Sequence, residues 1–305
     1  MREQRDGAVP MIGPGDTVRL VSPASFPADA WPIEASIAVL EGWGLRVEVG
    51  DHALDRWGYM AGHDDDRAAD LNAALRDRRV RAIFTTAGGA GAYRIVDAID
   101  FDAARRDPKP VVGFSDITNL HLALWRHCGS VGVHGGLAGA RQQRSVRQVL
   151  MSTEPVVLQR DPAALTAGIE VPGRATGHLV GGHLTTLSGY VGTPGFRLHG
   201  AVVLLEDVRT IGLGRVDRAL TQLVRSGAFA GVRGFALGRF LGYDDYEDRG
   251  WTVRDVLRER LGALGVPVLG GLDVGHGEDP VAVPLGGRVT IDVADGTLEA
   301  EPIVR

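Results

Sequence analysis

A serine at position 115 stands where a short apolar run passes directly into a helical pattern. Residues 111–116 read VVGFSD, and helical spacing begins at Ile117. A tight turn between a strand and a helix is typical of the nucleophile elbow, which exposes a serine hydroxyl at the carboxyl edge of a sheet. The N–H groups at the start of such a helix can stabilise a developing oxyanion. The match to G-x-S-x-G is only partial because Ile117 replaces the second glycine, and on spacing alone a helix cap at Ser115 or Asp116 is the commoner outcome.

A glycine-rich segment, TTAGGAGAYR at residues 85–94, follows another β-rich run. Backbone N–H groups of Gly88 and Gly89 could complete an oxyanion hole or hold a phosphate. The segment is not a P-loop because it lacks Gly-Lys-Ser/Thr, and Arg94 takes the last glycine position of G-x-G-x-x-G. Alone, it is equally consistent with an ordinary turn.

Two further candidates lie in the second half of the chain. The strand-like run 201–207 ends in Glu206 and Asp207, at a position where α/β proteins build sites, although a solvated capping pair is the commoner role. His276 lies between two glycines, which leave its ring free to reach another loop, and an ordinary exposed histidine is the alternative. A metal site is disfavoured because the chain has no HExxH motif and no cysteine cluster, and Asp64–Asp66 is the charged start expected of a helix.

Together these features provide a serine, an acid and a histidine in that order, with two glycine-containing sources of backbone donors. This set is complete for a triad hydrolase.

Alternating strands and helices are expected to position the first group of residues. The βαβα rhythm of residues 1–150 predicts an α/β domain with a parallel sheet covered by helices. The pattern loosens in residues 151–175, which contain three prolines and predict a linker. Residues 176–305 are expected to form a second α+β domain that carries Glu206 and His276.

Composition narrows the class of protein. The net charge of −5 and the lack of a basic stripe argue against a nucleic-acid partner. The single cysteine, Cys128, excludes an internal disulfide. The first residues lack the apolar core of a signal peptide, and no stretch approaches the roughly 20 apolar residues that cross a membrane. A cytoplasmic protein without membrane association is therefore expected.

The chain resembles the LD-carboxypeptidase family of serine peptidases, which includes murein tetrapeptide carboxypeptidases and microcin C immunity hydrolases. The resemblance extends over nearly the whole chain and rests on several blocks in the same order. These blocks are VRLVSPAS, GYMAGHDDDRAADLNAAL, PKPVVGFSDITNLHLAL with HGG after it, GHLVGGHLTTLSGYVGTP, LLEDV followed by VDRALTQL, and GHGEDPVAVPLG.

The resemblance implies that Ser115 is the nucleophile, Glu206 rather than Asp207 is the triad acid, and His276 is the base. It also implies a Rossmann-like N-terminal domain, a smaller C-terminal domain, a site at their junction, a homodimer and no cofactor. Oxyanion and substrate binding are expected from Gly88, Gly89 and Asp116.

One departure from the family pattern concerns specificity. Murein-type members usually carry Arg-Gly-Gly-Tyr-Gly where this chain has Ala87 and Ala90 around the two glycines. Loss of a charged bidentate donor at a binding wall can change which substrate is accepted. The expected substrate is a peptide or muropeptide with an L,D amide bond. The alternatives are a microcin-like peptidyl or aminoacyl nucleotide, and a non-catalytic protein that binds a small molecule through residues 85–94.

Overall fold

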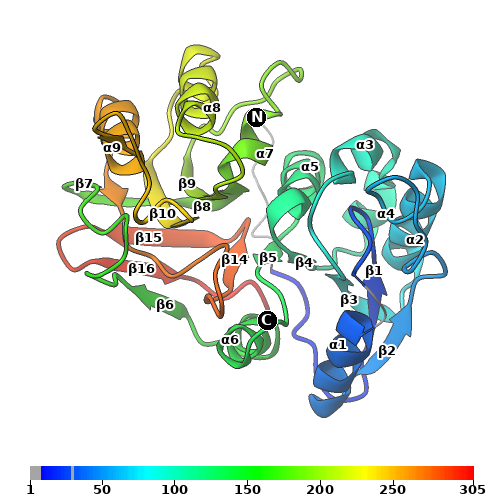
Figure 1. Cartoon of the computed structure of the whole chain (residues 1–305). Helices are drawn as coiled ribbons and strands as arrows, with labels where there is room; N and C mark the ends of the chain where they lie inside the picture. The colour runs from blue at the N-terminus through cyan, green and yellow to red at the C-terminus, as the bar shows by residue number, and fades with distance from the viewer. Residues whose placement is uncertain (1–7, 29–30) are drawn as a thin grey trace. The chain divides into compact units, whose positions relative to one another are not determined.

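Residues 8–28 and 31–305 are described by a computed structural model. The chain divides into two units, drawn together in Figure 1. The first unit runs to Glu154 and also contains residues 282–287 and 302–305. The second unit comprises residues 155–281 and 288–301.

The first unit is built on a six-stranded sheet of order β14-β5-β4-β3-β1-β2. Its strands β1 to β5 run parallel, and β14 joins β5 antiparallel at the edge. The parallel part has the doubly wound order 2-1-3-4-5, whose switch point lies between β1 and β3. The predicted α/β fold class is therefore confirmed. The strand bounds are Thr17–Val21 (β1), Arg46–Val49 (β2), Val80–Thr85 (β3), Val111–Gly113 (β4), Gly132–His134 (β5) and Val283–Leu285 (β14).

Six α-helices in the described part of this unit flank the sheet (Figure 1). Apolar side chains of α2 to α5 pack with those of β1, β3 and β4 in one buried cluster, which fixes the strand ends that precede the glycine-rich loop and Ser115. The bounds are Trp31–Gly42 (α1), Asp64–Arg76 (α2), Ala92–Ile95 (α3), Phe101–Arg106 (α4), Thr118–Cys128 (α5) and Ala140–Met151 (α6), with 3₁₀ turns at Val96–Ala98 and Ser115–Ile117.

The helical pattern at residues 93–107 predicts one continuous helix, whereas the structure divides this segment. A new helix starts after Asp100, whose carboxylate accepts a hydrogen bond from the Ala103 N–H at 2.9 Å. An aspartate N-cap stabilises a helix start, so the polar residue at position 100 overrides the apolar periodicity.

The second unit contains an eight-stranded mixed sheet of order β6-β16-β15-β8-β9-β10-β13-β7. Strands β8, β9, β10 and β13 are parallel, and the others pair antiparallel. The bounds are Val156–Gln159 (β6), Glu170–Val171 (β7), Arg174–His183 (β8), Ala201–Val208 (β9), Gly234–Leu241 (β10), Val268–Leu269 (β13), Arg288–Asp292 (β15) and Thr297–Ala300 (β16). A small hairpin of Glu247–Asp248 (β11) and Trp251–Thr252 (β12) and the helices Leu184–Ser188 (α7), Gly214–Arg225 (α8) and Val253–Gly262 (α9) complete this unit.

The segment expected as a linker contributes to this second sheet. Strand β6 pairs with β16, and β7 pairs with β13. The local sequence of this proline-containing segment does not predict these short strands, because they form by pairing with strands about a hundred or more residues away in the chain.

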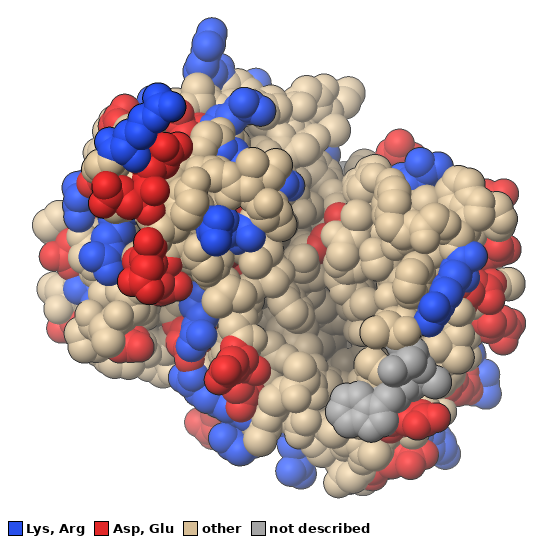
Figure 2. Space-filling view, viewed as in Figure 1, with Lys and Arg blue, Asp and Glu red and all other residues tan. Residues whose placement is uncertain are grey.

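Charged side chains on the visible face of the second unit are of mixed sign (Figure 2). Arg260 of α9 forms an ion pair with Asp217 of α8 at 2.7 Å. Within the described ranges, no helix is long and apolar enough to cross a membrane.

Candidate active site

The turn that carries Ser115, defined here as the nucleophile turn (residues 114–117), has a strained backbone. Ser115 has a φ of 63°, and in the described part of the chain only Arg249 among the other non-glycine residues also has a positive φ. The left-handed conformation costs an L-residue about 1–2 kcal/mol, and a strained strand-to-helix turn is the geometry of a nucleophile elbow. The N-cap of α5 is Ile117, so neither Ser115 nor Asp116 is the cap of that helix.

The glycine-rich loop lies against this turn. A Cβ atom at Gly88 would lie 2.9 Å from the Ser115 Cβ and 3.3 Å from its Oγ, so only glycine fits at this distance. Gly89 has a φ of 88°, and a Cβ there would collide with Ser25. Ser25 holds the loop by donating its N–H to the Gly88 carbonyl at 3.0 Å and accepting the Ala90 N–H on its Oγ at 3.1 Å. Gly88 thus lies beside the predicted nucleophile in the first unit, and Gly89 follows it in the loop that Ser25 holds.

Asp116 is buried and connects the nucleophile turn to its neighbours. Its carboxylate accepts hydrogen bonds from the Ala92 N–H at 2.7 Å and from the Asn119 side chain at 2.8 Å. An ionised carboxylate only accepts hydrogen bonds, so it cannot itself stabilise an oxyanion. These contacts suit Asp116 to hold the loop and α5 in place, and its expected contribution to substrate binding stays a prediction.

The second unit brings Glu206 and His276 together. Glu206, near the end of β9, is fully buried, and its Oε2 accepts both the His276 Nδ1–H at 2.7 Å and the His276 backbone N–H at 3.1 Å. A neutral imidazole that donates from Nδ1 keeps Nε2 as a proton acceptor, which is the arrangement of a general base oriented by an acid. Gly275 is required beside them because a Cβ there would lie 2.6 Å from the Glu206 Cγ.

Asp207, the neighbouring acid, points to a different group of residues. Its Oδ2 accepts hydrogen bonds from the Thr185 N–H at 3.0 Å and the Thr185 hydroxyl at 2.8 Å, and its Oδ1 lies 3.2 Å from His183 Nε2. The residues alone left Glu206 and Asp207 open as candidates. In the structure, the first pairs with His276 and the second with His183.

His183 also lies at the candidate site, although the sequence alone does not single it out. Its ring centre lies 5.4 Å from that of His276, and the backbone of His183 is in register with Glu206 across β8 and β9. Burial opposes protonation, but the hydrogen bond and charge of Asp207, together with the charge of Glu206, raise the pKa of His183 above its usual value. One feature of the sequence could have pointed to His183: it ends the block GHLVGGH. This block forms strand β8, which pairs with the strand that carries Glu206.

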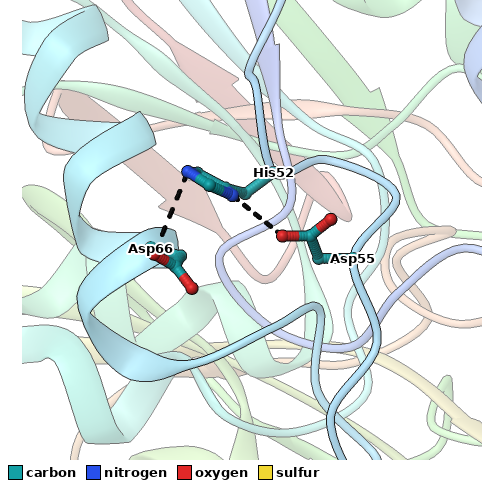
Figure 3. Close-up of side chains that lie close together, drawn as sticks. All are labelled: His52, Asp55 and Asp66. Carbon is teal, nitrogen blue, oxygen red and sulfur yellow. Dashed lines mark hydrogen bonds and ion pairs between the residues drawn. The ribbon is translucent and has the colours of Figure 1, made fainter.

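His52, Asp55 and Asp66 form an exposed cluster whose potential metal-ligating atoms lie within 4.8 Å of one another (Figure 3). His52 Nδ1 is 2.8 Å from an Asp55 oxygen, and Nε2 is 3.9 Å from an Asp66 oxygen. The hydrogen bond that the Asp55 carboxylate accepts from His52, together with the charges of Asp70, Asp66 and Asp55, raises the pKa of His52. Because the two carboxylates face opposite ring nitrogens (Figure 3), this arrangement is that of an ion-pair network.

The comparisons with known proteins agree with these features. Residues 18–135 match the model of the LD-carboxypeptidase N-terminal domain, and residues 176–291 match that of the C-terminal domain. A Streptomyces coelicolor protein, provisionally named a carboxypeptidase, is 41% identical over 302 residues, which cover 94% of each chain. The murein tetrapeptide carboxypeptidase of Pseudomonas aeruginosa is 31% identical over 295 residues, covering 90% of this chain and 92% of that protein.

The fold also has a solved counterpart. A Bacillus anthracis protein similar to MccF, the microcin C7 self-immunity protein, superposes with a TM-score of 0.84 at 23% identity, covering 96% of this chain and 98% of that one. A strained serine at a strand-to-helix turn and a histidine that is hydrogen-bonded to a buried acid are features of serine hydrolases. With both domain models matched, the chain belongs to the LD-carboxypeptidase family and is a serine-type carboxypeptidase.

Proposed function

We propose that this chain hydrolyses the L,D amide bond of a muropeptide and releases its terminal D-amino acid. Ser115 is the nucleophile, His276 the general base and Glu206 the residue that orients the imidazole. The observation that carries the proposal is the hydrogen bond between His276 and the buried Glu206. The other matched domain of this chain carries Ser115 in the left-handed conformation.

The proposed reaction has two halves. Ser115 Oγ attacks the amide carbonyl while His276 Nε2 takes its proton, and Glu206 stabilises the resulting imidazolium. The N–H of Ser115 and an N–H of Gly88 or Gly89 hold the oxyanion. His276 then protonates the leaving amine, and a water molecule activated by the same imidazole hydrolyses the ester on Ser115.

The muropeptide substrate is supported by the name of the Pseudomonas aeruginosa relative. Recycling of cell-wall peptides by a cytoplasmic homodimer is part of the same proposal, since the release of a terminal D-alanine from a tetrapeptide belongs to that process. Ala87 and Ala90 favour a second candidate, a microcin-type peptidyl or aminoacyl nucleotide, because the usual arginine and tyrosine for a muropeptide terminus are replaced by methyl groups.

The test compares both substrates directly. The wild-type protein is incubated with a muropeptide tetrapeptide and, separately, with an aminoacyl sulfamoyl nucleotide, and release is followed by mass spectrometry. Release of D-alanine supports the proposal, whereas cleavage of the nucleotide conjugate alone selects the second candidate. Ser115→Ala should lower turnover by roughly three or more powers of ten, and Ser226→Ala, in the second unit, is the matched control with normal turnover.

Near-normal activity of Ser115→Ala would refute the assignment of the nucleophile. A serine-directed fluorophosphonate separates the enzyme from a binding protein. Labelling at Ser115 that is absent from the alanine variant supports hydrolysis, and inertness of the folded wild-type protein supports a non-catalytic binder.

A further inference from the structure

Arg67 is a buried cation to which the proposed reaction gives no role. It belongs to α2 and is only 1% exposed, a position at which an ion without partners would be costly. Its charge is balanced by Asp64, one turn earlier on the same helix, which accepts a hydrogen bond from Nη2. Hydrogen bonds from Arg94 and from Arg67 lower the pKa of Asp64, so this carboxylate is ionised at neutral pH.

The other terminal nitrogen of Arg67 links two loops. Nη1 carries two hydrogens, and it donates to the Pro23 carbonyl at 2.5 Å and to the Gly91 carbonyl at 2.9 Å. Pro23 follows β1 and Gly91 follows β3. Because β1, β3 and β4 are parallel, both loops leave the same carboxyl edge as the nucleophile turn. In doubly wound sheets this is the edge at which sites are built.

Both carbonyls lie close in the chain to the groups that form the glycine-rich loop. Ser25, two residues after Pro23, donates its N–H to the Gly88 carbonyl at 3.0 Å. Gly91 ends the run of glycines with a φ of 125°, and a Cβ atom there would lie 3.0 Å from Arg67 Nη1. Arg67 therefore holds both the segment that supports the loop and the end of the loop itself.

The peptide that joins Gly91 to Ala92 is held between two buried charges. Its carbonyl accepts the hydrogen bond from the Arg67 cation, and its N–H donates to the Asp116 carboxylate at 2.7 Å. Asp116 is 5% exposed and directly follows Ser115. Hydrogen bonds to ionised groups are about twice as strong as neutral ones, and linked hydrogen bonds polarise one another. A continuous set of contacts thus runs from α2 through this peptide to the nucleophile turn.

We propose that Arg67 is a positioning residue of the oxyanion hole. Through the Gly91–Ala92 peptide and Asp116, it sets where the N–H groups of the glycine-rich loop lie relative to Ser115. The inference rests on the proposed function, because it takes these N–H groups as donors to the oxyanion. A donor that moves by about 1 Å can cost on the order of a hundredfold in rate. Loss of Arg67 should therefore weaken stabilisation of the transition state.

A pair of serine-directed probes measures the oxyanion contacts. One is a fluorophosphonate, and the other is its phosphonothioate analogue, in which sulfur replaces the phosphoryl oxygen. Sulfur accepts hydrogen bonds only weakly, so the oxygen-to-sulfur ratio of the labelling rates at Ser115 reports the oxyanion donors. In Arg67→Lys this ratio should fall at least about tenfold, because a compact ammonium replaces the fork that reaches both loops and Asp64. An unchanged ratio in the folded variant would overturn the proposal.

Lys109 provides a matched control because it is another buried cation of the first unit. It is 2% exposed, and it donates to the Leu75 carbonyl and the Asp107 carboxylate, each at 2.8 Å. It precedes β4 and so lies at the opposite edge of the sheet from the nucleophile turn. Lys109→Met and Arg67→Met each remove one buried charge and should both lower stability, but only the second should lower the oxygen-to-sulfur ratio. An equal fall in both variants would leave Arg67 a purely structural role and contradict the proposal.

A double substitution tests whether Arg67 acts through the shared peptide. Asp116→Asn removes the charge at the other end of that peptide. Groups that act as one unit have effects that do not add, so the variant with both Arg67→Met and Asp116→Asn should lower the ratio only about as much as the more damaging single substitution. A fall equal to the product of the two single effects would show that the residues act separately, against the proposal.

Amide hydrogen exchange distinguishes failure of this role from failure of the proposed function. Exchange of the Ala92 N–H, followed by NMR relative to the amides of β1, does not depend on the reactivity of Ser115. It should become at least about tenfold faster in Arg67→Met and remain near the wild-type value in Lys109→Met. This result supports the role of Arg67 even if the wild-type Ser115 is unreactive, an outcome that refutes the proposed function alone. Unchanged exchange in Arg67→Met overturns the positioning role whatever Ser115 does.

Discussion

His121 should make the stability of the protein depend on pH, and the size of this effect follows from its surroundings. The side chain lies on α5, beneath the strand that leads to Ser115, and its Nε2–H donates to the Val111 carbonyl at 3.0 Å. Burial, assisted by the charge of His134 and opposed by the Val111 carbonyl, lowers the pKa of His121 to about 3. The native imidazole is therefore neutral throughout the range in which an unfolded histidine titrates.

The sign of the effect follows from proton binding. Below a pH of about 6.5 the unfolded chain takes up a proton on His121, whereas the native protein does not until about pH 3. The stabilisation from neutral His121 is therefore fully present above the pKa of the unfolded chain, about 6.5. It is lost as the pH falls from there toward the native pKa of about 3. Between pH 7 and pH 5 this one residue should lower the free energy of unfolding by about 2 kcal/mol.

His121→Leu removes the titrating group and should reduce the loss of stability between these two pH values by about 2 kcal/mol relative to the wild-type protein. Urea denaturation, followed by tryptophan fluorescence at pH 7 and pH 5, measures the free energy of unfolding of both proteins. Subtracting the change in the variant from the change in the wild-type protein removes the contribution of the other titrating groups. His199→Leu changes an exposed histidine and should behave as wild type. An equal loss of stability in His121→Leu and wild type would show that the native ring takes up a proton in this range.

Three further predictions concern the site itself. Glu206→Gln should reduce kcat by roughly a hundredfold or more with little change in KM, because His276 loses the charge that orients and stabilises it; steady-state kinetics with unchanged kcat would contradict this role. Ser115→Gly and Ser115→Ala should both be inactive, but the glycine variant should be more stable in urea by about 1 kcal/mol because it relieves the left-handed backbone; a more stable alanine variant would contradict the strain. Asp207→Asn should lower the pKa of His183, as measured by NMR titration. In the wild-type protein the stability from this pair is fully present below the unfolded pKa of about 6.5 and is lost as pH rises through the raised native value, so the variant should show less loss of stability between pH 6 and pH 8.

The sequence was sufficient for the α/β class of the first unit because its elements are locally encoded. Residues 111–128 illustrate this, since an apolar strand, a turn and a helix follow one another with the expected periods. The conformation of Ser115 was not encoded there alone. Its positive φ occurs where Gly88, from another loop, packs against it, and no periodicity in either segment reports that approach.

The pairing of Glu206 with His276 illustrates a second limit. These residues lie 70 positions apart, and their spacing does not show which of two adjacent acids points to the histidine. The alternation of side chains along β9 separates the two acids, because successive side chains of a strand face opposite sides of the sheet. Glu206 therefore faces the His276 loop while Asp207 faces Thr185 and His183. The catalytic assignment of Ser115, Glu206 and His276 stays a prediction that the experiments above test.

The short strand β14 has a consequence for how the protein is made. It completes the sheet of the first unit beside β5, and Val304 pairs with Val9, so this unit contains residues from both ends of the described chain. A ribosome that releases the chain from its amino terminus exposes the nucleophile turn long before residues 283–285 emerge. The edge of β5 therefore remains uncovered during most of synthesis, and an unpaired edge strand is a template for unwanted association. A nascent chain stalled before residue 283 should consequently need protection by chaperones at an edge that the finished protein covers.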